Sequence, residues 1–290
     1  MIVRKMALIA ALCLSVGYAS PQDSGGSPEE PDFFFMTGGP YTQQKHSPQI
    51  IWGQQWLSGT TKDRTVKELS GSGRVEFGIT DFLEADFEFG LTRASEEFPA
   101  FTQVETQLDG LMLGTRYRVL REEFAPFTLT IGPQFLIPTS TSRPWETGSG
   151  YGVDVTAAKD WGGPIFAAAS INWRNTPGVR AIPEGPSASL QELAYAFALG
   201  LRPLEHATGN DTRHDLHVFL ELQTNREDAI EGSEISRSTT VFLAPGTRYG
   251  FLNKRGILAE VGVALPIGLD RDAPDWGAIL QLQIEAPSLF

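Results

Sequence analysis

The stretch GITDFLEADFEFGL, residues 78–91, decides the fold class of this chain. From Leu83 to Leu91, apolar residues stand at every second position, and the positions between them are acidic or small. Successive side chains of a β-strand point to opposite faces, so this pattern predicts a strand with one apolar and one polar face. The apolar set is Leu83, Ala85, Phe87, Phe89 and Leu91, and the set between them is Glu84, Asp86, Glu88 and Gly90.

Similar alternation recurs along the chain from Pro48 to the end, and no amphipathic helix is indicated there. Turn-forming residues separate one alternating segment from the next. The sequence therefore predicts twelve strands, with the approximate spans 48–58, 66–79, 82–93, 104–120, 126–137, 149–159, 163–174, 189–202, 214–224, 237–250, 255–267 and 276–286.

The connections between these segments alternate in length, as in an up-and-down barrel whose two rims face different compartments. The segment 203–213 is too long for its rim and departs from the pattern. Short connections are expected at 80–81, 121–125, 160–162 and 251–254. Longer ones, with Gly, Pro and acidic residues, are expected at 94–103, 138–148, 175–188, 225–236 and 268–275.

The length of the segments favours a membrane barrel. Each reaches the roughly 9–11 residues that a tilted transmembrane strand needs, and an even number of strands allows the sheet to close. The last strand alternates and the chain ends in Phe290, as in the signal read by the outer-membrane assembly machinery of Gram-negative bacteria. We predict an all-β fold, a transmembrane antiparallel up-and-down β-barrel of about twelve strands in the outer membrane. The bilayer and that machinery are its expected partners.

A soluble secreted β-barrel or sandwich is the competing fold. Its apolar residues would fill the interior, and periodicity alone does not tell which face is inside. Trp161, Tyr249 and Trp276 lie near predicted strand ends, where a membrane barrel carries aromatic girdles. Each of them could equally pack at a turn of a soluble domain.

The amino terminus predicts export. Arg4 and Lys5 precede an apolar run at 6–16 and small residues up to Ala19, which is the pattern of a cleaved signal peptide over residues 1–19. The run is shorter than the roughly 20 residues of a spanning helix. Cys13 also allows a lipoprotein, but Leu12 stands where a small residue is expected.

Residues 20–47 form a Pro-, Gly- and acid-rich segment that we expect in the periplasm, ahead of a barrel over 48–290. Its apolar stretch Phe33-Phe34-Phe35-Met36 has two interpretations. One is packing on the domain, which we favour, and the other is insertion into the lumen.

Composition excludes several functions. The formal net charge is −12, opposite in sign to that of a nucleic-acid-binding protein, so no nucleic-acid partner is expected. The single cysteine gives no disulfide, and no zinc pattern or nucleophile-elbow motif is present. The acidic loop around Asp270 and Asp272 lacks the full calcium-ligand pattern. We therefore expect no cofactor, no metal and no catalytic residue, and we interpret His217, four residues before Glu221, as a polar lumen residue.

The charged residues on the polar faces are the best functional candidates. If the apolar faces contact lipid, these residues line the lumen, where charges need partners. Carboxylates and guanidiniums on neighbouring strands would then form a constriction or simply fill the interior. The set is Arg74, Glu76, Glu84, Asp86, Glu88, Arg116, Arg118, Asp154, Arg174, Glu192, Glu221, Arg248, Glu260 and Glu285.

Five segments carry a resemblance to a known family. They are GITDFLEADFEFGL, LMLGTRYRVL, PFTLTIGPQFLIPTS, GYGVDVTAAKDWGG and FLAPGTRYGF, which resemble the outer-membrane transporters named for the MetA pathway of phenol degradation. The resemblance covers residues 48–290 and implies an outer-membrane barrel that admits small aromatic or otherwise hydrophobic solutes. Passive transport through a narrow pore is the function we expect. The alternatives are a structural or surface-binding barrel, a soluble binding protein and, more distantly, an outer-membrane enzyme.

Overall fold

The computed structural model describes residues 35–37, 39, 41–61, 64–97, 102–139, 148–161, 164–180, 187–208, 212–231, 234–253 and 255–287. No helix within these ranges has the length and apolar character to cross a membrane. The signal peptide and Phe290 lie outside the described residues. The strands are β1 (Pro48–Thr61), β2 (Arg64–Thr80), β3 (Leu83–Glu97), β4 (Thr102–Leu120), β5 (Thr128–Ile137), β6 (Gly150–Asp160), β7 (Ile165–Val179), β8 (Ala188–Thr208), β9 (Thr212–Glu231), β10 (Glu234–Leu252), β11 (Leu258–Ala264), β12 (Ile267–Gly268) and β13 (Trp276–Glu285).

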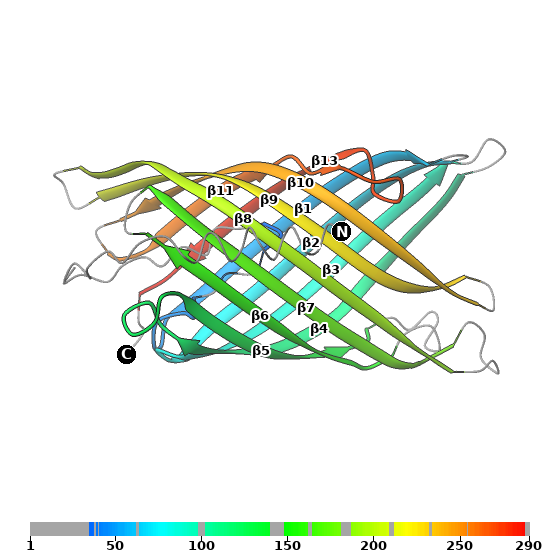
Figure 1. Cartoon of the computed structure of the whole chain (residues 1–290), viewed down its shortest axis with the longest axis horizontal. Coiled ribbons are helices and arrows are strands. Elements are labelled where there is room, and N and C mark those ends of the chain that lie inside the picture. The colour runs from blue at the N-terminus through cyan, green and yellow to red at the C-terminus, as the bar shows by residue number, and fades with distance from the viewer. Residues whose placement is uncertain are drawn as a thin grey trace.

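The strands form one closed antiparallel sheet (Figure 1). Each long strand pairs with the next along the chain, and β1 pairs with β13 over Gln49–Ser58 to complete the ring. The short β12 follows β11 after Pro266, and both lie between β10 and β13. Because β11 and β12 share one place in the wall, the barrel has twelve strand positions, and the predicted fold class is confirmed.

Several hairpins extend further than predicted. The pairing of β8 with β9 continues to Thr208 and Thr212, so 203–213 is mostly strand. The predicted long connections at 94–103 and 225–236 are also mostly strand, and β7 continues to Val179 within the predicted connection 175–188. The alternation in hydropathy weakens towards these ends, whereas the backbone hydrogen-bond ladder continues with polar side chains.

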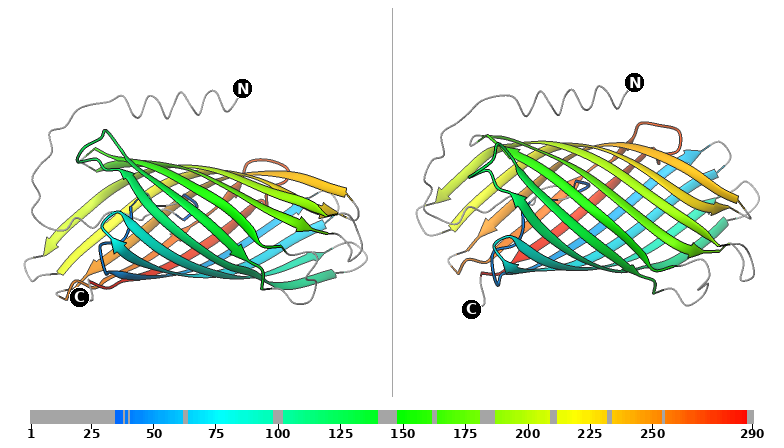
Figure 2. Two further views of the ribbon diagram at one scale, coloured as in Figure 1. Left: turned by 90° about the horizontal axis from the view of Figure 1, so that it is seen from below. Right: turned by 60° about the horizontal axis from the view of Figure 1, so that its bottom comes forward.

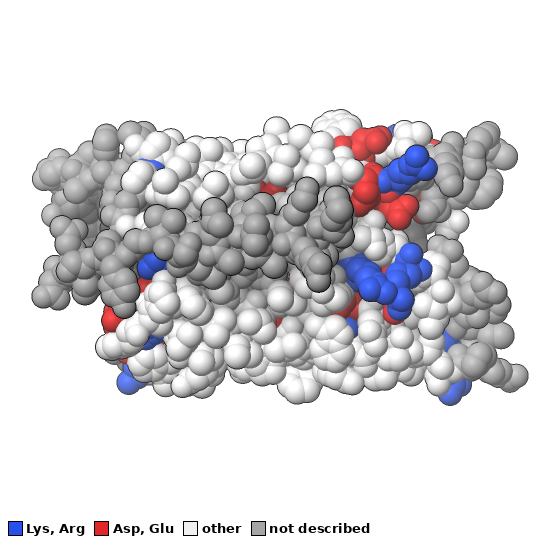
Figure 3. Space-filling model, in the orientation of Figure 1, with Lys and Arg blue, Asp and Glu red and all other residues white. Residues whose placement is uncertain are grey.

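The outer face of the barrel wall is apolar and the inner face is polar, as a bilayer requires. Apolar side chains such as Phe89 and Leu282, each 45% exposed, point outward, whereas Glu76 and Glu84 are 0% exposed inside. In Figure 3 uncharged residues cover most of the described middle of the visible face, and charged residues gather towards one end. A soluble barrel would have the reverse arrangement, so the alternative of a soluble fold is wrong.

Aromatic side chains lie near both ends of the strands. Trp276, the first residue of β13, contacts Trp56 edge to face with ring centroids 4.5 Å apart. Towards the other rim, Tyr249 of β10 lies beside His214, with ring centroids 5.9 Å apart. Such amphipathic rings are typical of the interfaces between bilayer and water.

The opposite faces of β3 give a matched test of this orientation. Phe87 is exposed on the outer surface, whereas Glu88 points inward to Arg74. We expect Phe87→Arg to cost about 2–4 kcal/mol, because a charge would face lipid, and Glu88→Gln to cost less. The measurement is the fraction of folded barrel, read from the gel mobility of unboiled samples. Equal losses, or a larger loss in Glu88→Gln, would show that the faces are assigned the wrong way round.

Candidate functional site in the barrel lumen

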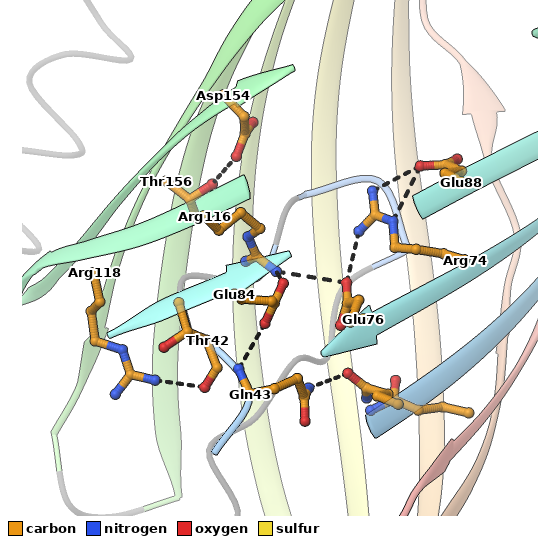
Figure 4. A network of polar contacts seen from close by, with 12 residues as sticks. Thr42, Gln43, Arg74, Glu76, Glu84, Glu88, Arg116, Arg118, Asp154 and Thr156 are labelled. Carbon is orange, nitrogen blue, oxygen red and sulfur yellow. Dashed lines mark hydrogen bonds and ion pairs between the residues drawn. The ribbon is translucent and has the colours of Figure 1, made fainter. Parts of the chain in front are cut away.

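Charges of both signs meet on the inner faces of β2, β3 and β4 (Figure 4). The two terminal nitrogens of Arg74 lie 3.2 Å from Glu76 and 3.0 Å from Glu88. Arg116 Nη1 lies 3.2 Å from Glu84 and 3.7 Å from Glu76. On each strand the charged residues stand two positions apart, so they share the inner face. Arg74 pairs with Glu88 in the register between β2 and β3, and Glu84 pairs with Arg116 in the register between β3 and β4, which brings the charges of the three strands together.

A second polar cluster lies on the wall formed by β10, β11 and β13. Arg248 is 1% exposed and donates a hydrogen bond of 2.5 Å to the side chain of Gln281. It also lies 3.4 Å from Gln283 and 3.6 Å from Glu260. A buried guanidinium needs several acceptors, and the inner faces of β11 and β13 supply them.

His217 is fully buried and stands opposite Arg248 in the register between β9 and β10. Its Nε2 lies 3.2 Å from Asp215, and its ring contacts Phe166 edge to face at 5.8 Å. Arg202 covers the same phenyl ring at 4.8 Å and pairs with Asp160 at 2.6 Å. The histidine therefore belongs to a polar and aromatic group of the wall.

The chain before β1 enters the lumen. We call residues 35–37, 39 and 41–47 the N-terminal segment. Figures 1 and 2 show its described residues inside the ring of strands. The backbone N–H groups of Phe35, Met36 and Thr37 donate to the carboxylate of Glu221, at 2.9, 2.9 and 2.8 Å. Phe33 and Phe34 lie outside the described residues, and the contacts of Phe35 and Met36 favour insertion into the lumen over packing on the domain.

The same segment also binds the β2 to β4 cluster. The backbone N–H of Gln43 donates to Glu84 at 2.7 Å, and Arg118 Nη2 donates to the carbonyl of Thr42 at 2.9 Å. The side chain of Gln43 donates to Gln49 of β1 (Figure 4). Residues of the segment thus serve as partners for charges on two sides of the lumen.

An internal cavity of about 180 Å³ remains beside Met36. Three arginines and three carboxylates, from β2 to β8, line it together with amide side chains. Its wall includes Arg74, Asp86, Arg116, Gln134, Asp154, Asn172, Arg174, Glu192 and Gln223.

Three further candidate carboxylates, Asp154, Glu192 and Glu285, lie outside these two clusters. Asp154 accepts a hydrogen bond from Thr156 at 3.0 Å, and Arg174 lies 3.5 Å from Glu192. Glu285 stands opposite Gln49 in the register between β13 and β1. Sequence reasoning missed the uncharged partners, namely Thr42, Gln43, Gln49, Gln134, Asn172, Gln281 and Gln283. The alternation of Gln281 and Gln283 with leucines was the available signal for two of them.

Comparison with known proteins supports the fold. No family model and no curated protein matches the sequence. The COG4313 outer membrane channel from Pseudomonas putida F1 is similar in structure, with a TM-score of 0.55 and 14% identity over 87% of this chain and 99% of that one. The translocator domain of the autotransporter NalP from Neisseria meningitidis has a TM-score of 0.48 and 10% identity, over 83% of this chain and 88% of that one. The first likeness shows that this chain has the fold of an outer-membrane β-barrel.

The charge network predicts a coupled pair of substitutions. Arg116→Gln should cost about 3–5 kcal/mol, because it removes a guanidinium from the buried carboxylates Glu76 and Glu84. Adding Glu84→Gln should restore part of this loss, since one buried charge disappears with its partner. Urea unfolding in detergent, followed by tryptophan fluorescence, measures both. A double variant no more stable than Arg116→Gln would contradict the coupling.

Proposed function

We propose that this protein is an outer-membrane channel for the passive passage of small solutes. The internal cavity lined by arginines and carboxylates is the observation that supports this function. Polar groups that converge on an internal space are typical of solute sites. The exposed apolar belt and the likeness to a solved outer-membrane channel support the location.

The dimensions favour a narrow passage. Twelve strands enclose more space than an eight-stranded barrel filled by side chains, and less than the sixteen to eighteen strands of open porins. The paired charges and the N-terminal segment reduce this space further. Such a lumen suits one small solute at a time rather than a continuous water column.

The resemblance to the MetA-pathway transporters suggests small aromatic or hydrophobic solutes. The cavity wall is charged, so an aromatic solute that carries a polar group fits it better than a hydrocarbon. The fully buried carboxylates Glu76 and Glu84 favour a second function, a closed structural or surface-binding barrel. Neither proposal assigns a catalytic step to the lumen.

Ion selectivity tests the channel. Planar bilayers containing the protein should show small, discrete conductances. Asp154→Asn with Glu192→Gln should shift the reversal potential in a salt gradient away from cations, because both carboxylates line the cavity and act at short range. Arg174→Gln, on the same wall, should shift it in the opposite direction.

The control is Asp228→Asn, which alters a carboxylate bound to Arg237 at 2.6 Å near the end of β9 and away from the cavity lining. It should leave selectivity unchanged. Absence of conductance from wild type and all variants, with folded barrels in the membrane, would favour the closed structural barrel.

A further inference from the structure

Glu221 is a fully buried carboxylate whose hydrogen-bond donors, among the described residues, come from the N-terminal segment. One of its oxygens accepts from Phe35, and the other accepts from Met36 and Thr37. Charge-assisted bonds of this kind are about twice as strong as neutral ones. Burying a carboxylate without hydrogen-bond donors is costly. The wall around Glu221 therefore needs donors such as these three backbone N–H groups.

The surrounding wall also fits the Phe35 side chain. Its ring packs on Phe219 with centroids 5.2 Å apart, and the guanidinium of Arg248 lies over it at 5.5 Å. Gly262 of β11 leaves the necessary space, because a Cβ there would lie 2.5 Å from the ring. An aromatic pocket, a cation and an anion therefore meet around three consecutive residues.

The wall accommodates the segment at a second place. A Cβ on Gly78 would lie 1.9 Å from the carbonyl oxygen of Gln44, and the backbone N–H of His46 donates to the carbonyl of Gly78 at 2.7 Å. Close backbone approach of this kind requires glycine. The inner wall thus accommodates the described part of the N-terminal segment at two places, beside Gly78 and beside Glu221.

We infer that the inner wall around Glu221 is a binding site for a short, bent peptide segment, and that Phe35–Thr37 occupies it as a tethered ligand that partly closes the lumen. The ligand class is a peptide with an aromatic side chain followed by free backbone N–H groups. A short tether gives an effective concentration of about 1 mM, so the segment outcompetes dilute peptides. The closing role rests on the proposed channel, whereas the binding site does not.

The test uses a labelled synthetic peptide with the sequence of residues 35–44, added to the full-length protein in detergent. Phe35→Ala with Met36→Pro removes the ring and one N–H donor from the segment without altering the wall. Fluorescence anisotropy should show peptide binding by this double variant at least about tenfold tighter than by wild type, whose site is filled. Equal binding by the two proteins, or none by a folded double variant, would overturn the inference.

Two wall variants in this background locate the site. Adding Glu221→Gln should abolish binding, whereas adding Asp228→Asn, a buried carboxylate on the same strand, should leave it intact. Should Glu221→Gln fail to fold, Gly262→Ala serves instead, because it fills the space of the ring while keeping the carboxylate. Binding that survives both Glu221→Gln and Gly262→Ala would place the peptide elsewhere and refute the site.

Conductance separates the site from the channel. The double variant should conduct more than wild type, and the peptide should reduce its current. Binding without any conductance in either protein would reject the channel and the closing role but leave the peptide site standing. Conductance that is the same in wild type and double variant, and insensitive to bound peptide, would reject the closing role alone.

Discussion

The closed ring of backbone hydrogen bonds is the constraint on which the rest of this structure depends. A bilayer supplies no partner for a free strand edge, so β1 must pair with β13. Closure fixes which face of every strand is inside. The apolar face then contacts lipid, and the other face must place its polar side chains in a confined lumen.

That lumen explains the charge network and the inserted segment together. Arg116 serves both Glu76 and Glu84, because charges removed from bulk water need partners. For the buried carboxylate Glu221, the N-terminal segment supplies three backbone N–H donors. The N-terminal segment therefore completes the polar interior and narrows the passage at the same time.

The sequence predicts the strands and their faces because alternation is a local property. Phe87 beside Glu88 is enough to show two faces, although it does not show which is inside. Which charges meet depends on register, as in the pairing of Glu84 with Arg116, and register is not local. Insertion of the apolar stretch was the less favoured of two interpretations, because the insertion depends on a carboxylate 186 residues from Phe35 that no local pattern connects with it. The extended β8–β9 hairpin was missed because its outer part lacks a regular apolar period.

The central claim is that the apolar faces contact lipid and the polar faces line the lumen. Nitroxide labels on single cysteines along β13, in a Cys13→Ser background, test it directly in lipid vesicles. Labels at Leu280, Leu282 and Ile284 should show high accessibility to oxygen, which concentrates in the bilayer, and labels at Gln281 and Gln283 should show low accessibility. The opposite alternation, or none, would contradict the account.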